Sequence, residues 1–127
     1  MLKILMVGLG GAGGSILRYL ASGYVQQLLN SATFPYGTLV VNVLGCLIIG
    51  FLSELAEAHG MFTPETRALV LIGMLGGFTT FSTFGNESMN LLRDGESALA
   101  LINIGASILF GLAAVWLGRT AAYTLWR

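Results

Sequence analysis

The sequence predicts an all-α membrane protein with four transmembrane helices per chain, and its composition leads to this expectation. Of its 127 residues, 55% are hydrophobic and only 9% are charged, and the mean hydropathy is +0.81. A soluble domain carries roughly 25% charged residues, because its surface faces water. A small chain has more surface for its volume and needs even more polar cover. Lipid is therefore the solvent that this composition fits.

The distribution of charges divides the chain into four apolar segments. A helix that crosses about 30 Å of hydrocarbon needs about 20 mostly apolar residues. The uncharged run 19–53 contains a polar break from Gln26 to Tyr36, so it contributes to two spans. We expect one transmembrane domain, 1–127, with spans near 4–22, 36–57, 67–91 and 97–119. Before the third span, Thr63 is placed to cap a helix that has Pro64 at its first position.

The first span allows two other interpretations, and neither is favoured. Lys3 followed by apolar residues is typical of a signal peptide, but the stretch continues through glycine-rich sequence and no cleavage-like site precedes a soluble domain. Residues 8–13 match the dinucleotide-binding pattern G-x-G-x-x-G, which needs a strand before it and an acidic residue about 20 positions on. The first acidic residue after it is Glu54. Close packing of membrane helices through small residues explains the glycines better.

Cationic residues give only a weak indication of orientation. Loops rich in Lys and Arg face the cytoplasm. Four spans place Lys3, Arg67, Arg119 and Arg127 on one side of the membrane and Arg18 and Arg93 on the other. This split of four to two is compatible with insertion in both orientations.

The third span contains residues that disfavour a continuous helix. Gly76 and Gly77 are followed by Thr79 and Thr80, which lowers helix propensity near the middle of the span. Non-helical backbone at membrane depth occurs only where it is buried in protein or lines a water-filled path, and its free carbonyls can coordinate a cation such as Na⁺. The alternative is a kink in which the threonine hydroxyls bond back to the helix backbone. The motif alone leaves both open.

Two aromatic residues and one amide are candidates for an anion pathway. Phe81 and Phe84 are spaced i, i+3 on one helical face, and the positive edge of a phenyl ring can hold a small anion without a full charge. Asn42 lies in the middle of the second span, where an amide is costly unless it finds a partner. It either joins two helices or donates an N–H to an anion. For the phenylalanines the alternative is packing against lipid or core.

The remaining polar residues exclude several function classes. Arg18 near the end of the first span is either an electropositive vestibule or a side chain that snorkels to the interface. Cys46 and His59 belong to no metal-ligand cluster. The net charge is zero, so the chain lacks the excess of basic residues that indicates nucleic acid binding. No nucleophile–base arrangement or cofactor motif stands out, so we do not expect an enzyme.

Residues 76–84, Gly-Gly-Phe-Thr-Thr-Phe-Ser-Thr-Phe, together with residues 37–42 and the glycine-rich stretch 10–18, resemble the Fluc (CrcB) family of fluoride channels. The resemblance covers essentially the whole chain. It implies an antiparallel, dual-topology homodimer in the bacterial inner membrane, with two fluoride pores and a third helix broken near the midplane. Passive export of cytoplasmic fluoride through these pores would give fluoride resistance.

The resemblance also implies roles for particular residues. Asn42 would be the pore amide, and the ring edges of Phe81 and Phe84 would meet fluoride. The other implied pathway residues are Ser82, Thr83, Glu87, Thr38 and Ser107, with Arg18 at the vestibule. The backbone carbonyls of Gly76 and Thr79 from both subunits would hold a structural Na⁺. Asn103 is a departure, because an aromatic hydroxyl is expected there in some relatives.

Two rival classes have a similar size and helix count. A small dual-topology multidrug or cation transporter uses a carboxylate embedded in its first span, which is absent here; Glu87 is the only carboxylate clearly inside a span. A structural membrane subunit would use the break and Asn42 for packing alone. Loss of function without loss of the dimer, on changing Phe81 or Phe84, would count against that class.

Overall fold

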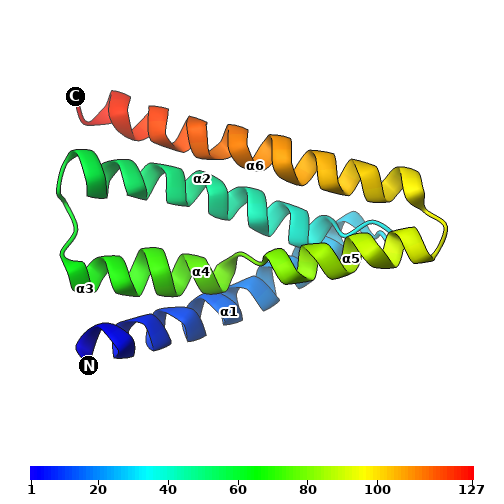
Figure 1. Cartoon of the computed structure of the whole chain (residues 1–127), viewed down its shortest axis with the longest axis horizontal. Coiled ribbons are helices and arrows are strands. Elements are labelled where there is room, and N and C mark those ends of the chain that lie inside the picture. The colour runs from blue at the N-terminus through cyan, green and yellow to red at the C-terminus, as the bar shows by residue number, and fades with distance from the viewer.

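The computed structural model describes residues 1–127 and is entirely helical (Figure 1). Its elements are α1 (Leu2–Leu29), α2 (Tyr36–Ala58), α3 (Pro64–Arg67), the π-helix η1 (Ala68–Met74), α4 (Leu75–Phe78), α5 (Phe81–Arg93) and α6 (Ser97–Leu125). The prediction of four helices long and apolar enough to cross a membrane is confirmed, and the third of these comprises α3 to α5. Both termini and the α2–α3 connection lie at one end of the bundle (Figure 1).

Two helices extend beyond the spans that the sequence predicts. The helix α1 ends at Leu29 rather than near residue 22, and α6 ends at Leu125 rather than near residue 119. A polar or charged residue does not end a helix when tertiary contacts satisfy it. In α6, the guanidinium of Arg119 lies 3.3 Å from Glu54 and 3.2 Å from Glu57 of α2. The helix therefore continues past this charge.

In α1 the corresponding residue is Gln26, whose side chain organises the α1–α2 loop. Its Nε2 donates to the carbonyls of Ser31 and Phe34 at 2.6 and 2.9 Å, and its Oε1 accepts from the Gly37 N–H at 3.0 Å. These bonds satisfy loop backbone groups that the helices on either side cannot reach. The helix then stops at Asn30, which has left-handed backbone geometry with φ of 47°.

We expect Gln26→Ala to lower the free energy of unfolding by about 2 kcal/mol, because it leaves partly buried backbone groups of the loop without partners. Thermal denaturation of the detergent-purified protein measures the change. Gln27→Ala is the matched control, since Gln27 is exposed and its side chain makes no hydrogen bond. Equal melting temperatures for the two variants would contradict this role of Gln26.

Glycines allow α1 to lie directly against the first half of the third span. A Cβ at Gly10 would lie 2.1 Å from the Leu69 carbonyl oxygen, and one at Gly14 would lie 2.0 Å from the Met74 carbonyl oxygen. The backbones of α1 and of η1 and α4 are therefore in contact. Because α1 is helical from Leu2 onward, the strand that a dinucleotide-binding motif requires is absent. The glycines serve close helix packing.

The third span begins as expected and then departs from regular α-helix. The prediction that Thr63 caps this helix is confirmed, because Thr63 Oγ1 accepts from the Thr66 N–H at 3.2 Å and Pro64 is the first helical residue. The π-helix η1 follows at once, and nothing in the sequence indicates it. Such wide turns are rare in α-helices and occur frequently at functional sites.

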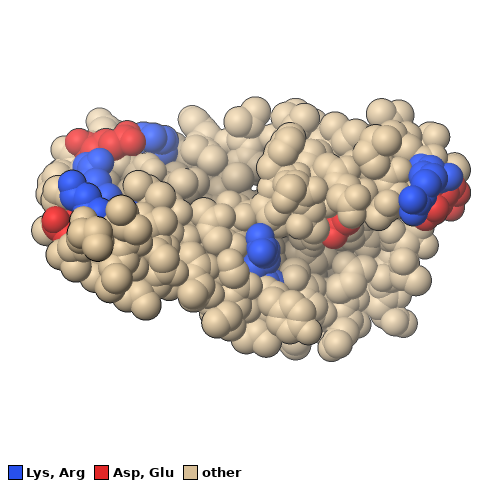
Figure 2. All heavy atoms as spheres, turned by 60° about the horizontal axis from the view of Figure 1, so that its bottom comes forward, with Lys and Arg blue, Asp and Glu red and all other residues tan.

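Charged side chains are confined largely to the two ends of the bundle (Figure 2). The face shown in Figure 2 has a wide band of uncharged atoms, in which one small basic and one small acidic patch appear. Such a band suits a protein surrounded by hydrocarbon. By sequence, Arg18 lies well inside α1 and Glu87 lies in the middle of α5.

Candidate functional site

The helical backbone of the third span stops at Phe78 and resumes at Phe81. Between them, Thr79 (φ −92°, ψ 157°) and Thr80 (φ −153°, ψ 120°) have extended backbone. The hydroxyl of Thr79 bonds back to the Leu75 carbonyl at 3.0 Å. The hydroxyl of Thr80 accepts from the Thr83 N–H at 3.3 Å, so Thr80 is the N-cap of α5.

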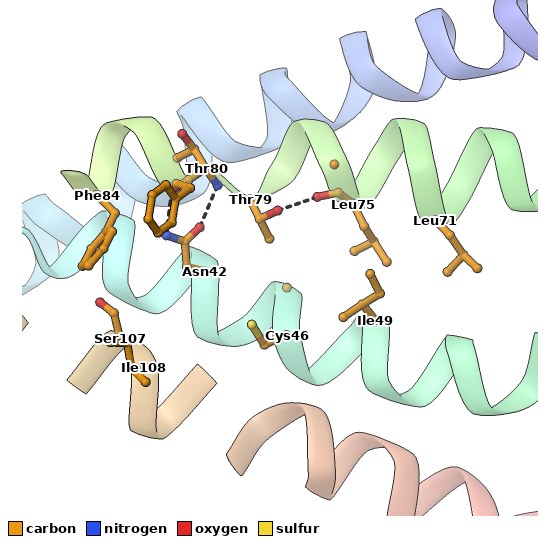
Figure 3. Close-up of a pocket in the computed structure, with 13 residues that line it drawn as sticks. Asn42, Cys46, Ile49, Leu71, Leu75, Thr79, Thr80, Phe84, Ser107 and Ile108 are labelled. Carbon is orange, nitrogen blue, oxygen red and sulfur yellow. Dashed lines mark hydrogen bonds between the residues drawn. The ribbon is translucent and has the colours of Figure 1, made fainter. Parts of the chain in front are cut away.

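The side chain of Asn42, on α2, holds the extended residue Thr80 from across the bundle. Its Nδ2 donates to the Thr80 carbonyl at 3.0 Å, and its Oδ1 accepts from the Thr80 N–H at 2.8 Å (Figure 3). The N–H and the carbonyl of Thr80, which lie at the interruption of the helix, are thus both satisfied by one amide. The amide has two N–H donors, and the bond to Thr80 uses one of them. The structure shows the helix-joining role of Asn42 and leaves one donor for another partner.

This arrangement removes the usual helical donors from two carbonyls. In a continuous helix, the Thr80 N–H would donate to Gly76 and the Thr83 N–H would donate to Thr79. Here the first donates to Asn42 and the second to the Thr80 hydroxyl. Gly76 is exposed, and a Cβ built on it would meet nothing within 4 Å. The carbonyl oxygens of Gly76 and Thr79 therefore lack their helical donors.

A cavity of about 390 Å³ lies beside this interruption, bounded by α2, η1 to α5 and α6 (Figure 3). Its wall is largely apolar, with Asn42, Thr79, Thr80 and Ser107 as its polar residues besides Cys46. The Ser107 hydroxyl is buried and has no hydrogen-bond partner within the chain. Such a hydroxyl is free to bind something that enters the cavity.

Two phenyl rings border the same cavity. The ring centroids of Phe81 and Phe84 are 5.5 Å apart and their planes are tilted by 53°. Phe84 is half-buried and lies near Ser107 of α6 (Figure 3). Phe81, in contrast, is 83% exposed in the single chain. A ring this exposed faces either lipid or a second protein surface.

Two further cavities lie beyond the large cavity, toward the end of the bundle that carries the α1–α2 loop. The second, of about 170 Å³, shares Thr80 with the large cavity. The third, of about 340 Å³, shares Ser22 and Thr38 with the second. Polar residues predominate in the lining of the second and third cavities, which includes Ser15, Arg18, Ser22, Gln26, Thr33, Thr38, Thr80, Thr83 and Glu87. The three cavities form a series along α5.

Comparison with known families identifies the chain. Residues 5–119 match the model of the family described as CrcB-like protein, Camphor Resistance (CrcB). The chain belongs to the CrcB family. The predicted resemblance is confirmed, and with four helices of spanning length this CrcB-family chain is a multi-pass membrane protein.

Curated CrcB-family relatives match over nearly their whole length. The protein named fluoride-specific ion channel FluC 1 of Methanosarcina acetivorans is 46% identical over 98% of this chain and 94% of its own length. Proteins named fluoride-specific ion channel FluC are 50% identical in Opitutus terrae, over 95% of this chain and 92% of the relative, and 48% identical in Nitrosococcus oceani, over 93% and 94%.

The structure of this CrcB-family chain brings most of the expected pathway residues to the three cavities. Those that line them are Arg18, Thr38, Asn42, Gly76, Thr79, Phe81, Thr83, Phe84, Glu87 and Ser107. Thr38 Oγ1 donates to Glu87 Oε1 at 2.8 Å. Ser82 lines none of the three, and its exposed hydroxyl lies 3.3 Å from that of Thr80. Arg18 lies beside Thr80 and Thr83 in the second cavity, well before the end of α1.

Sequence reasoning missed several residues that line the cavities of this CrcB-family chain. Ser15 and Ser22 line the second cavity together with Arg18, and Gln26 lines the third. A signal for them exists in the sequence. Positions 15, 18, 22 and 26 recur at intervals of three and four, which places them on one face of a helix. A polar stripe on a membrane helix indicates a face turned toward protein or water.

Proposed function

We propose that this chain is a subunit of a passive, fluoride-selective channel that exports cytoplasmic fluoride and gives fluoride resistance. The observation that carries the proposal is the series of cavities that leads to the rings of Phe81 and Phe84 beside the interrupted helix. The names of the curated relatives, fluoride-specific ion channels, support fluoride as the ion. The protein then moves an ion and catalyses no reaction.

The lining chemistry suits a small, strongly hydrated anion. A pore must replace the water shell of fluoride with hydrogen-bond donors or equivalent partners. Arg18 attracts anions into the second cavity, and the hydroxyls of Thr83 and Ser107 and the second N–H of Asn42 act as donors. The ring edges of Phe81 and Phe84 add positive electrostatic potential without a full charge. The anion therefore binds weakly enough to leave, and the membrane potential drives it outward.

An antiparallel, dual-topology homodimer in the bacterial inner membrane accounts for features of the single chain. Phe81 lines the large cavity and is 83% exposed, and a second subunit would cover it. The weak four-to-two distribution of cationic residues suits insertion in both orientations. In this arrangement the interruption at Thr79 and Thr80 lies near the membrane midplane, where non-helical backbone needs protein cover.

A structural Na⁺ fits the carbonyls of Gly76 and Thr79. Both oxygens have lost their helical donors, to Asn42 and to the Thr80 hydroxyl. Two carbonyls from each subunit provide an all-oxygen donor set, which is the chemistry that hard cations such as Na⁺ prefer. The ion would offset the negative ends of these carbonyl dipoles and join the two subunits. Asn42 keeps the Gly76 carbonyl free by engaging the Thr80 N–H.

The rival transporter class finds less support. A proton-coupled multidrug or cation transporter needs a carboxylate exposed to its central path in the first span, and α1 has none. Glu87 lies instead on α5, in the outer part of the series, where the Thr38 hydroxyl donates to its Oε1 at 2.8 Å and its buried Oε2 has no partner within the chain. A structural subunit would not need a buried hydroxyl without a partner, as at Ser107.

Growth of a fluoride-sensitive bacterium that expresses this chain tests the proposal. We expect the wild type to restore growth in fluoride and Phe84→Ala to lower the fluoride export rate by about tenfold or more, since a ring interaction of about 1.5 kcal/mol corresponds to tenfold in rate. Phe110→Ala is the matched control, because Phe110 is on α6 and lines none of the three cavities. Resistance to cationic drugs in place of fluoride would favour the transporter, and full resistance with Phe84→Ala would contradict the assigned pathway.

A further inference from the structure

Asn103 and Ser88 are the two buried polar side chains of the molecule, 2% and 5% exposed. Asn103 Nδ2 on α6 donates to Ser88 Oγ on α5 at 3.0 Å, and Ser88 Oγ donates to the Phe84 carbonyl at 2.8 Å. This is the only side-chain hydrogen bond between α5 and α6. The sequence left Asn103 without a role, and it is not among the residues that line the large cavity.

The spacing of these residues connects the buried bond to the fluoride pathway. Ser88 follows Phe84 by four positions on α5, and Ser107 follows Asn103 by four positions on α6. Residues four apart lie one above the other on the same helical face. The two helices therefore meet at two adjacent levels, one with the Ser88–Asn103 bond and one with Phe84 and Ser107 at the wall of the large cavity (Figure 3).

Apart from the Thr38–Glu87 hydrogen bond to α2, few contacts fix the rotation of α5 about its own axis. Besides Ser88, only Leu91 of α5 is fully buried in the chain. The start of α5 follows the two extended threonines, so no continuous helix from α4 sets its rotation. A buried amide that lost its partner would be costly. The Asn103–Ser88 bond thus favours one rotation of α5, and that rotation directs Phe84 toward Ser107.

We propose, on the basis of the proposed function, that Asn103 and Ser88 are positioning residues for fluoride conduction. They set the orientation of α5 so that the ring of Phe84 lies opposite the Ser107 hydroxyl. Neither side chain contacts the ion in this account. Their loss enlarges or misaligns the gap between Phe84 and Ser107, which slows fluoride and admits chloride more readily.

The test measures fluoride and chloride release from liposomes that contain Asn103→Leu or Ser88→Ala protein. Leucine keeps nearly the volume of asparagine and removes its donor. We expect each variant to remain a folded dimer, to release fluoride about tenfold more slowly, as for the loss of one buried hydrogen bond, and to lower the fluoride-to-chloride ratio. Exchanging the pair, Ser88→Asn with Asn103→Ser, restores a donor and an acceptor and should recover much of the rate.

Thr120→Val is the control on the same helix, because the exposed Thr120 hydroxyl bonds only to the Trp116 carbonyl of its own helix. If Asn103→Leu protein releases fluoride at the wild-type rate and with wild-type selectivity, this inference is overturned and the proposed function is not affected. Failure of Asn103→Leu and Ser88→Ala to fold would also overturn it, since the pair would then serve stability only. Slow fluoride release with unchanged selectivity in the exchanged pair, Ser88→Asn with Asn103→Ser, would overturn it as well. No fluoride release from folded wild-type protein would overturn the proposed function and this inference together.

Discussion

Replacing Asn42 with leucine should abolish fluoride release, because it removes both partners of the Thr80 backbone. The two hydrogen bonds, 2.8 and 3.0 Å long, satisfy an N–H and a carbonyl inside the bundle. Each such group left unsatisfied costs about 1–3 kcal/mol. That cost is large enough for Thr80 to lose its fixed extended geometry, and the neighbouring carbonyls of Gly76 and Thr79 are then no longer held in place. The variant therefore loses both the shape of the pathway and the carbonyls proposed to hold Na⁺.

Amide hydrogen exchange in fluoride-free buffer separates this role from direct binding of the ion. We expect exchange of the Thr80 N–H to accelerate in Asn42→Leu before any fluoride is added. Asn86→Leu is the control, because Asn86 is exposed on α5 and its side chain makes no hydrogen bond. Unchanged exchange at Thr80, with fluoride release lost, would show that Asn42 acts on the ion alone.

Valine at Gly14 should prevent the chain from folding, whereas valine at Gly13 should be tolerated. A Cβ at Gly14 would lie 2.0 Å from the Met74 carbonyl oxygen and 2.9 Å from the Phe78 nitrogen, both of them backbone atoms. Relief requires α1 to separate from η1 and α4, which costs about 3 kcal/mol. At Gly13 a Cβ meets nothing within 4 Å.

The yield of monodisperse protein and its melting temperature in detergent measure this difference. Both variants add the same side chain to the same helix, so helix propensity and hydrophobicity cancel in the comparison. We expect Gly14→Val to give little or no folded protein and Gly13→Val to resemble the wild type. Similar melting temperatures would mean that α1 does not lie directly against α4.

Local sequence features are enough to predict the number of spans and the interrupted segment, residues 76–84. Four apolar segments of sufficient length are visible without any tertiary information, and the start of the third span is determined by Thr63 and Pro64. The run of residues 76–84 indicates both an interruption and the family. These features depend on neighbouring residues in the chain.

Features that depend on distant residues could not be predicted in the same way. The helices α1 and α6 extend beyond the predicted spans, because Gln26 and Arg119 obtain partners from the loop and from α2. Two roles remained open for Asn42, since its partner Thr80 lies 38 positions further along the chain. Asn103 had no assigned role until Ser88 was found beside it. The π-helix η1 has no sequence signature at all.

The central claim, that this chain forms a fluoride-selective pore, is tested most directly by ion release from liposomes that contain the purified protein. An ion-selective electrode follows fluoride and then chloride, while a potassium ionophore clamps the membrane potential. The account predicts rapid fluoride release and little chloride release, with the rate strongly reduced in Phe84→Ala and unchanged in Phe110→Ala. Protein shown to be folded and dimeric that releases no fluoride, or releases chloride equally fast, would contradict it.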